Sequence, residues 1–297
     1  MKKLLLFLAV SIGATALCAT TAFAQEKEKV VTGTISILAP SNVTILDEFI
    51  SNQLYTGSSV FTGLDVRLGA LYRKHDNLSW DVHYTGYNRP KLFEEGRILE
   101  TLSNPANTQY IKYSTYSIAY GTYYHWNIGK KLMIKTGGIC DLYGAMKNAT
   151  PDGVNNATSL EGQLILKAHA AIKYGWDFKK WGLDLRGRIS LPVVGLITSD
   201  HPSEKASSLI GANDHSITNP AFRHIFMAFY HNYMSLDYEI GIDFVLKPCT
   251  INLGLGNTSK WWSANDIQCI RKISYVSMGL SFDIVGRNKF KSSNRNF

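Results

Sequence analysis

Charged residues are scarce in this sequence of 297 residues. They make up 18% of the chain, whereas roughly 25% is typical of soluble globular proteins. Lys and Arg number 31 against 23 Asp and Glu, which gives a formal net charge of +8. No basic stripe accompanies this mild excess, so the composition does not support nucleic-acid binding. Hydrophobic residues make up 45% of the chain, which excludes a long disordered protein.

Cysteines are few, and motifs of known chemistry are missing. Cys18 lies in the leader described below, which leaves Cys140, Cys249 and Cys269 in the rest of the chain. Such a small odd number does not build a disulfide framework, and without a CxxC pair a zinc site has no support. The sequence also lacks the nucleophile elbow, HExxH, P-loop and dinucleotide fingerprints. We therefore assign no catalytic, cofactor-binding or metal residues, and no cofactor is implied.

Long hydrophobic runs are confined to the N-terminus. Met1-Lys2-Lys3 precedes an apolar stretch, and Ala22-Phe23-Ala24 forms a small-x-small cleavage site. This order predicts a secretory signal peptide over residues 1–24, followed by a single outer-membrane barrel domain over 25–297. No later run reaches the roughly 18 apolar residues of a membrane-spanning helix. If the mature chain enters a membrane, we expect it to do so as strands.

Alternation of apolar and polar residues is what the sequence has in abundance. From Leu160 to Trp176 the even positions are mainly apolar, while Glu161, Lys167 and Lys173 occupy odd positions. A period of two indicates a β-strand, and this run is far longer than the usual 5–6 residues. The same pattern recurs along the chain over 61–73, 78–86, 110–126, 131–146, 183–193, 234–246, 250–256 and 276–284.

The connections between these runs alternate between short and long. Short turns are expected at 75–77, 127–129, 177–181 and 247–249, and long loops at 88–108, 147–158, 198–229 and 257–270. Short turns at one end and long loops at the other are typical of outer-membrane barrels, whose strand number is even. A mature N-terminus in the periplasm then requires one more strand, for which Val30 to Leu38 is the candidate. We predict an all-β, antiparallel, up-and-down transmembrane β-barrel of about ten strands, with eight as the alternative, in the bacterial outer membrane.

The face that meets lipid follows from energetics. A lipid-facing Arg or Lys at mid-membrane costs about 2–4 kcal/mol, so the charged face is expected to line the interior, or lumen. Aromatic girdles are expected near the strand ends, from Tyr84, Trp126, Tyr174, Trp176, Trp181 and Trp261. The predicted lumen residues are Asp65, Arg67, Asp81, His83, Lys135, Asp141, Glu161, Lys167, His169, Lys173, Asp184, Arg186, Arg188, Asp237, Glu239, Asp243 and Asp283.

Two segments carry a resemblance to a known family. Ile45-Leu46-Asp47-Glu48-Phe49-Ile50-Ser51, followed by Leu54-Tyr55-Thr56-Gly57, resembles the motif Leu-Asp-x-Tyr-Leu-Ser-Pro, then Tyr-x-Gly, of an uncharacterised family of secreted Bacteroidetes proteins. Phe49 stands where that family has Tyr, and Asn52 where it has Pro. His231-Asn232-Tyr233 and Asn265-Asp266-Ile267 also look similar. The resemblance implies an outer-membrane β-barrel of unknown function and supplies no catalytic residues.

Two hypotheses place a catalytic site inside the lumen. Asp81 and His83 share one strand face, where carboxylate and imidazole could activate a water. Ser190, His169 and Asp184 form a possible nucleophile set on neighbouring strands. A charge network that fills the interior is the competing interpretation, and we favour it because narrow barrels are largely filled by side chains.

The expected function is therefore structural or surface-interaction, with a largely filled polar lumen. The alternatives are a membrane-embedded lipid or peptide hydrolase, a narrow pore, and a soluble secreted ligand-binding barrel with its apolar face inward. The expected partners are membrane lipid, the outer-membrane assembly machinery (for which the terminal Phe297 is a candidate signal) and an extracellular ligand bound through loop 198–229. That loop contains Asp200-His201-Pro202 and Asp214-His215.

Overall fold

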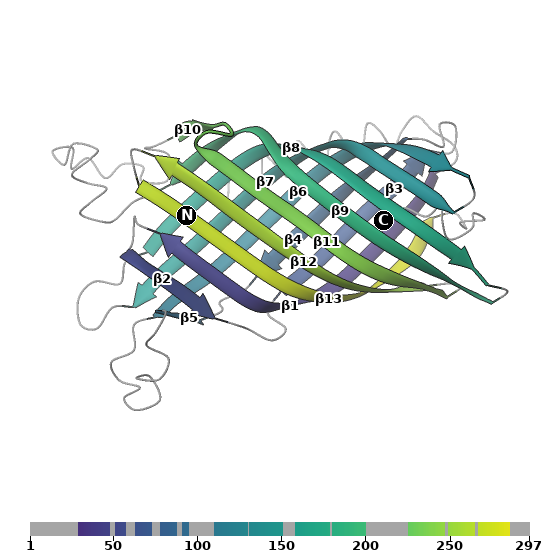
Figure 1. Cartoon of the computed structure of the whole chain (residues 1–297), viewed down its shortest axis with the longest axis horizontal. Coiled ribbons are helices and arrows are strands. Elements are labelled where there is room, and N and C mark those ends of the chain that lie inside the picture. The colour runs from purple at the N-terminus through teal and green to yellow at the C-terminus, as the bar shows by residue number, and fades with distance from the viewer. Residues whose placement is uncertain are drawn as a thin grey trace, which may run out of the picture.

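The structure, a computed structural model, places its described residues almost entirely in strands (Figure 1). The signal peptide predicted over residues 1–24 lies outside the described part of the chain. The described ranges are 29–47, 51–57, 63–72, 78–87, 91–94, 110–129, 131–150, 158–178, 180–199, 225–246, 249–264 and 267–285. Within these ranges, no helix is long and apolar enough to cross a bilayer.

Ten antiparallel strands form the wall of a closed barrel, because the last strand pairs with the first. The order around the wall is β1, β3, β4, β6, β7, β8, β9, β11, β12, β13 and back to β1. These strands are β1 (Lys29–Asp47), β3 (Gly63–Tyr72), β4 (Leu78–Tyr87), β6 (Tyr110–Ile128), β7 (Leu132–Thr150), β8 (Thr158–Asp177), β9 (Trp181–Ser199), β11 (Tyr233–Leu246), β12 (Cys249–Ala264) and β13 (Ile267–Val285).

Three further short strands continue strands of the wall rather than adding to their number. β2 (Ser51–Gly57) and β3 both pair with β1, β2 with its C-terminal part and β3 with its N-terminal part. β5 (Lys91–Glu94) continues β4 against β6 in the same way. β10 (Ile225–Ala228) continues β11 against β9. The ten-stranded antiparallel barrel predicted from the sequence is confirmed, with β1 as its predicted tenth strand, and the eight-stranded alternative is wrong.

Four connections are short and lie at one end of the barrel, which we call the short-turn end. They join β3 to β4, β6 to β7, β8 to β9 and β11 to β12, as predicted. In the turn after β6, Gly129 has a φ of 66°, a left-handed conformation that glycine adopts without steric cost. The opposite end, which we call the distal end, includes the connections from β4 to β6, β7 to β8 and β9 to β10.

Strands extend into all four predicted long loops, since β5 lies within 88–108 and both β7 and β8 reach into 147–158. The loop predicted over 257–270 is mostly strand, because β12 continues to Ala264 and β13 begins at Ile267. The loop predicted over 198–229 is shortened by β9, which reaches Ser199, and by β10. Both segments pair with neighbours that also extend past the alternating core of the barrel. Backbone hydrogen bonds therefore hold them as strands, although their side chains no longer alternate clearly.

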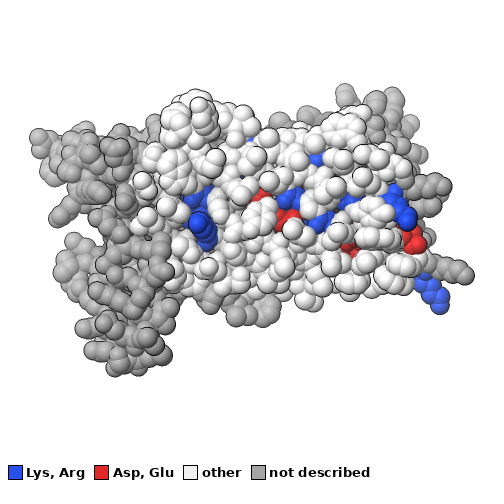
Figure 2. Space-filling model, in the orientation of Figure 1, with Lys and Arg blue, Asp and Glu red and all other residues white. Residues whose placement is uncertain are grey.

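The outer face of the wall is apolar. Ile240 of β11 is 60% exposed, and Leu255 and Met278 on the next two strands are each 64% exposed. Figure 2 shows one side of this surface, which is mostly neutral, with the visible charged atoms gathered in a band along the barrel. An apolar exterior around a charged interior is the arrangement predicted for a barrel in a bilayer. The soluble barrel with an inward apolar face is therefore not the geometry observed.

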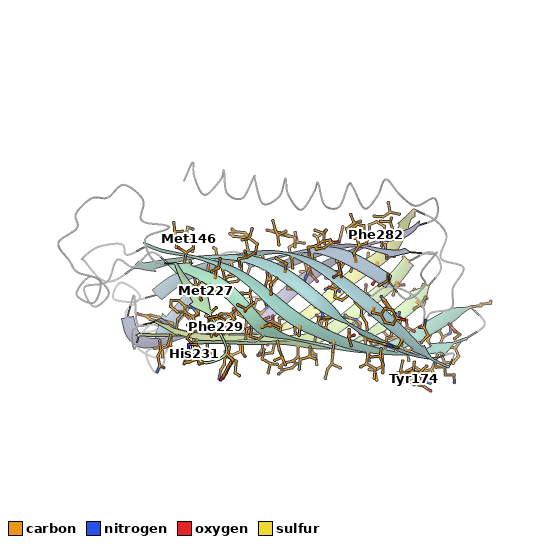
Figure 3. All side chains as sticks on the ribbon, turned by 90° about the horizontal axis from the view of Figure 1, so that it is seen from above. Met146, Tyr174, Met227, Phe229, His231 and Phe282 are labelled. Atoms are coloured by element: carbon orange, nitrogen blue, oxygen red, sulfur yellow. The ribbon has the colours of Figure 1, made fainter. Side chains whose placement is uncertain are left out.

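Aromatic side chains gather at the short-turn end. Tyr124 packs edge-to-face on Trp126 with ring centroids 4.8 Å apart, and Tyr174 packs on Trp176 at 4.6 Å. Trp181 is 42% exposed. Figure 3 places Tyr174 and Phe282 at this end, and Met146, Met227, Phe229 and His231 at the other. Of the residues predicted for the girdles, Trp126, Tyr174, Trp176 and Trp181 lie at the short-turn end, where amphipathic rings suit a membrane interface, whereas Tyr84 and Trp261 lie further toward the distal end.

Candidate functional site

The charged residues predicted for the lumen face inward. Arg186 and Arg188 are partly buried, and the side chain of Asp283 lies outside the described part of the structure. The buried members of the predicted set are Asp65, Asp81, Lys135, Asp141, Glu161, Lys167, His169, Lys173, Asp184, Glu239 and Asp243.

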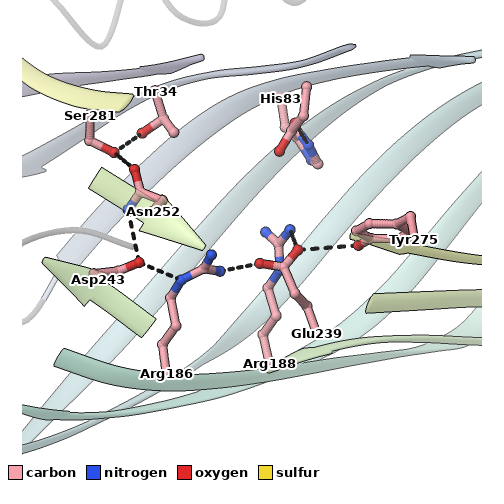
Figure 4. A network of polar contacts seen from close by, with 10 residues as sticks. Thr34, His83, Arg186, Arg188, Glu239, Asp243, Asn252, Tyr275 and Ser281 are labelled. Atoms are coloured by element: carbon pink, nitrogen blue, oxygen red, sulfur yellow. Dashed lines mark hydrogen bonds and ion pairs between the residues drawn. The ribbon is translucent and has the colours of Figure 1, made fainter. Parts of the chain in front are cut away.

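One polar network crosses the lumen near the short-turn end (Figure 4). Arg186 on β9 donates through Nε to Asp243 Oδ1 at 2.9 Å and through Nη1 to Glu239 Oε1. Arg188 Nη2 donates to Glu239 Oε2 at 2.6 Å, and the hydroxyl of Tyr275 donates to the same oxygen at 3.2 Å. Charges on β9 and β11 are thus paired across the strands.

The same network continues through neutral side chains to β1. Asn252 Nδ2 donates to Asp243 Oδ1 at 2.9 Å, and Ser281 Oγ donates to Asn252 Oδ1 at 2.7 Å. Ser281 is in turn hydrogen-bonded to Thr34 at 2.8 Å. Five neighbouring strands are therefore linked by side-chain bonds inside the barrel, in addition to the backbone ladders.

A second group of charges lies further toward the distal end. Lys167 Nζ donates to Asp141 Oδ2 at 2.5 Å and to Asp237 Oδ2 at 2.7 Å. Ser117 Oγ donates to Asp141 Oδ1 at 2.5 Å. Burial of an ion is expensive unless a counter-ion and hydrogen bonds offset it. Here each charge has at least one such partner, so this group fills space without an uncompensated ion.

The distal part of the lumen is filled by a predominantly aromatic and aliphatic set, which we call the distal cluster. Its inward-facing rings come from strands on all sides of the barrel, and Tyr113 and Ile165 have no measurable exposure. These side chains pack as two groups, one around Tyr113 and Tyr143 and one around Tyr233 and Trp262. The members of the distal cluster are Leu38, Val43, Ile45, Tyr55, Tyr87, Tyr113, Tyr143, Ala145, Ile165, Ile197, Ala228, Tyr233, Trp262, Cys269 and Ile273.

Polar groups inside the distal cluster are bonded to one another. Arg271 Nη2 pairs with Glu161 Oε2, and Arg271 Nη1 donates to the Tyr143 hydroxyl at 2.8 Å. Tyr143 and Tyr113 share a hydrogen bond of 2.6 Å between their hydroxyls. The Lys260 ammonium lies 3.3 Å from the centroid of the Tyr143 ring, which is cation–π geometry.

Sequence reasoning missed Arg271 and Lys260. Lys260 falls in the range 257–270 predicted as a loop, and Arg271 lies just after it, before the alternating run predicted over 276–284. The signal that could have found them is parity, because Arg271 keeps the phase of Tyr275 and Ser277 on β13, and all three face inward. Extending each strand by its own period would have placed both cations in the lumen.

The structure does not bring Asp81 and His83 together as a catalytic pair. His83 Nε2 pairs with Asp65 Oδ1 and lies 2.9 Å from Thr85 Oγ1. Asp81 accepts from the Tyr123 hydroxyl at 2.8 Å and lies 3.7 Å from Lys135 Nζ. The two side chains share a strand face, as predicted, but each is held by residues of other strands.

The second hypothetical set is assembled in part. His169 Nδ1 and Ser190 Oγ are hydrogen-bonded at 2.9 Å on β8 and β9. Asp184, the third member, instead lies 3.5 Å from Lys173 Nζ. The ring of His169 packs edge-to-face against Tyr123 with centroids 5.1 Å apart. A hydroxyl–imidazole pair is therefore present without the predicted carboxylate, which is bonded elsewhere.

A cavity of about 150 Å³ lies in the middle of the lumen, between the two networks. Ser190, His169 and His83 line it, together with Arg67 and Lys260. A second space of about 60 Å³ continues toward the short-turn end and shares Arg67 and Asp65 with the first. The lumen thus contains free space between its side chains, and charged residues line that space.

No metal site is found among the described side chains, since no three His, Cys, Asp or Glu residues are close enough to hold an ion. The Asp-His pairs of the predicted loop, Asp200-His201 and Asp214-His215, lie outside the described residues. Three cysteines, Cys140, Cys249 and Cys269, are free thiols.

Comparison with known proteins identifies a family match and several structures with a similar fold at low identity. The sequence profile of a family described as "Protein of unknown function (DUF3316)" matches residues 3–285. This confirms the predicted resemblance to an uncharacterised family. A search among curated proteins finds no match.

Solved structures of outer-membrane barrels resemble this chain at low identity. The outer membrane protease OmpT of Escherichia coli is 9% identical, with a TM-score of 0.45, over 88% of this chain and 99% of that one. An outer membrane channel from Pseudomonas putida F1 is 8% identical, with a TM-score of 0.40, over 87% and 97%. Neisserial surface protein A is 12% identical, with a TM-score of 0.31, over 86% and 97%. These likenesses carry no argument about activity.

Proposed function

We propose that this chain, which belongs to the DUF3316 family of unknown function, is a non-conducting outer-membrane barrel. In this role its distal end makes contacts at the cell surface. The observation that supports this role best is the distal cluster, whose buried side chains come from strands on all sides of the barrel. In this proposal the barrel is a structural anchor and the exposed connections carry the interaction.

The orientation follows from the connections. Outer-membrane barrels have short turns in the periplasm and longer loops outside, which puts the distal end at the cell surface. The apolar wall then meets lipid, and the aromatic side chains of the short-turn end lie at the inner interface. An extracellular ligand bound through residues 198–229 remains part of this proposal, as does recognition by the assembly machinery.

Fractionation tests the location. We expect the protein to sediment with outer membranes, to need detergent for extraction, and to migrate faster on gels when it is not boiled. Burial of all backbone polar groups in a closed barrel is the physical reason, since it resists denaturation by detergent at room temperature. Recovery of the folded protein from the periplasm without detergent would contradict the proposal.

Conductance tests the filled lumen. Purified protein inserted into planar bilayers is expected to give no stable current steps, because the distal cluster and the ion pairs leave no continuous water path. The control is a variant with Tyr113→Ala, Tyr143→Ala and Trp262→Ala, which removes three rings from the distal cluster. We expect that variant to conduct. Reproducible steps from the unmodified protein would argue for a pore instead.

Hydrolysis by a membrane-embedded enzyme is the second candidate, and the observation in its favour is the hydrogen bond between Ser190 and His169. Both residues border the central cavity, where a small substrate would meet the hydroxyl. A fluorophosphonate probe reacts with activated serine hydroxyls. The anchor role predicts no labelling of folded protein, whereas labelling that disappears in Ser190→Ala would favour the enzyme.

A further inference from the structure

Two cations that line the central cavity have no carboxylate at ion-pair distance among the described residues. Its carboxylates are Asp65, Asp81, Asp141 and Asp237, and its long cations are Arg67, Lys135, Lys167, Arg188, Lys260 and Arg271. Four of these cations have a carboxylate within 4 Å, in part from residues behind the lining such as Glu161 and Glu239. Within the described part of the chain, Arg67 and Lys260 have none.

Lys260 is the sharper case, because it is only 5% exposed. Its ammonium contacts the face of Tyr143 and lies 3.5 Å from Gln163 Oε1, which is a long hydrogen bond to a neutral acceptor. Asp141 and Asp237 attract the ammonium only from beyond ion-pair distance, and a buried ion without a contacting counter-ion carries a desolvation penalty that a neutral amide and a ring do not fully offset. The position therefore favours an additional anion.

Arg67 gives a second and independent sign. Its Nε atom is buried and has no hydrogen-bond partner among the described residues, and the same holds for Nε of Arg271, which also borders the cavity. Unsatisfied buried donors are uncommon in folded proteins, since each one costs free energy. Guanidinium groups have a planar set of donors that matches the oxygens of carboxylates and phosphates.

Size restricts the occupant. A cavity of about 150 Å³ is in the range that holds one molecule as small as benzene. Tyr113 and Tyr143 of the distal cluster border the cavity on one side, and a smaller space of about 60 Å³ shares Arg67 with it on the other. A ligand that reaches both Arg67 and Lys260 inside this cavity is thus small.

We propose that the central cavity is a binding site for a small oxyanion, a carboxylate or a phosphate group, held by Arg67 and Lys260. The proposal goes beyond the proposed anchor role and is tested by a different measurement, because anion binding and conductance are read separately.

The experiment is calorimetric titration of the whole folded barrel in non-ionic detergent at fixed ionic strength. Sodium phosphate, sodium acetate and sodium sulfate are the three probes. Saturable binding of phosphate alone or of acetate alone supports the site and identifies which oxyanion it takes. No saturable binding of any probe, or equal binding of all three, overturns the proposal.

Variants test the residues. We expect Lys260→Gln and Arg67→Gln each to weaken binding by about tenfold, because each removes a charge-assisted contact. The matched control is Lys272→Gln, which makes the same charge change one residue beyond Arg271 on the exposed face of β13; we expect its binding to equal that of the unmodified protein. Unchanged binding in both lumen variants overturns the proposal.

Stability without anion separates a binding role from a merely structural one. If Lys260 carries an unpaired charge, Lys260→Gln leaves the anion-free barrel at least as resistant to heat as the unmodified protein, and removes the gain that the anion gives. Arg67→Lys keeps a positive charge and is expected to retain part of the binding. A Lys260→Gln barrel that unfolds more easily and still responds to the anion contradicts the proposal.

Discussion

Replacing Arg271 by Leu is expected to lower the free energy of unfolding by about 3–5 kcal/mol, the cost of leaving a buried ionic partner alone. Arg271 is 2% exposed and pairs with Glu161, which is 4% exposed. Leu fills part of the volume but provides no donor, so the Glu161 carboxylate and the Tyr143 hydroxyl lose their bonds to Arg271. Urea unfolding of the barrel in lipid vesicles, followed by tryptophan fluorescence, measures the difference.

The double variant Arg271→Leu with Glu161→Leu is the informative control. Replacing both members of a buried ion pair by apolar groups is often close to neutral. We therefore expect the double variant to recover most of the stability that the single variant loses. Lys272→Leu, on the exposed face, is expected to change stability by less than about 0.5 kcal/mol. A double variant as unstable as the single one would show that packing, rather than charge pairing, holds this region.

Placing Arg at position 240 is expected to destabilise the barrel by about 2–4 kcal/mol if the wall faces lipid. Ile240 is 60% exposed and lies near the middle of β11. Its neighbours along the strand, Glu239 and Gly241, are both buried, so the new guanidinium has hydrocarbon on its side of the wall. Unfolding in vesicles gives the magnitude.

Leu246→Arg is the matched control, because Leu246 faces outward at the short-turn end of the same strand. Near the interface the cost of Arg falls to about 0–1 kcal/mol. The expected result is a clear difference between the two positions in vesicles. Equal and small effects at positions 240 and 246 would mean that water covers the wall, and the outer-membrane proposal would fail.

Strand number and facing could be predicted because a single strong constraint acts on both. In a closed sheet with lipid on one side, a residue such as Leu166 must face out and its neighbour Lys167 must face in. The alternation is therefore written into the sequence wherever the wall crosses the apolar layer. The ten-stranded barrel and the inward direction of Lys167, Asp184 and Glu239 follow from it.

The distal ends of the strands were harder to predict because that constraint relaxes there. In the stretch Asn257-Thr258-Ser259-Lys260-Trp261-Trp262 both faces carry polar or aromatic groups, so periodicity gives no clear strand. The ladder between β12 and β13 continues through it all the same. Lys260 was missed for that reason, and Arg271 was missed because it precedes the clear alternation of 276–284.

Partners inside the lumen could not be predicted, because they depend on register between strands. Asp81 and His83 lie on one face, yet His83 takes Asp65 of β3 as its partner and Asp81 takes Tyr123 of β6. Asp184 lies beside Lys173 instead of His169 for the same reason. Sequence gives the face of each residue, whereas the neighbour across the strand emerges only from the paired sheet.

The pairing of β1 with β13 has a consequence for biogenesis. The two strands pair from Val31 with Val285 to Asp47 with Cys269, which joins the earliest-synthesised strand to the latest. Contacts between residues so far apart in the sequence form slowly, because the entropy cost of closing the loop comes before the free energy gained from the contacts. The half-made polypeptide would expose an unpartnered strand at each margin, and neither is tolerated in lipid. The barrel can therefore close only when both β1 and β13 are available for pairing. Until then the unpaired strands need protection from aggregation.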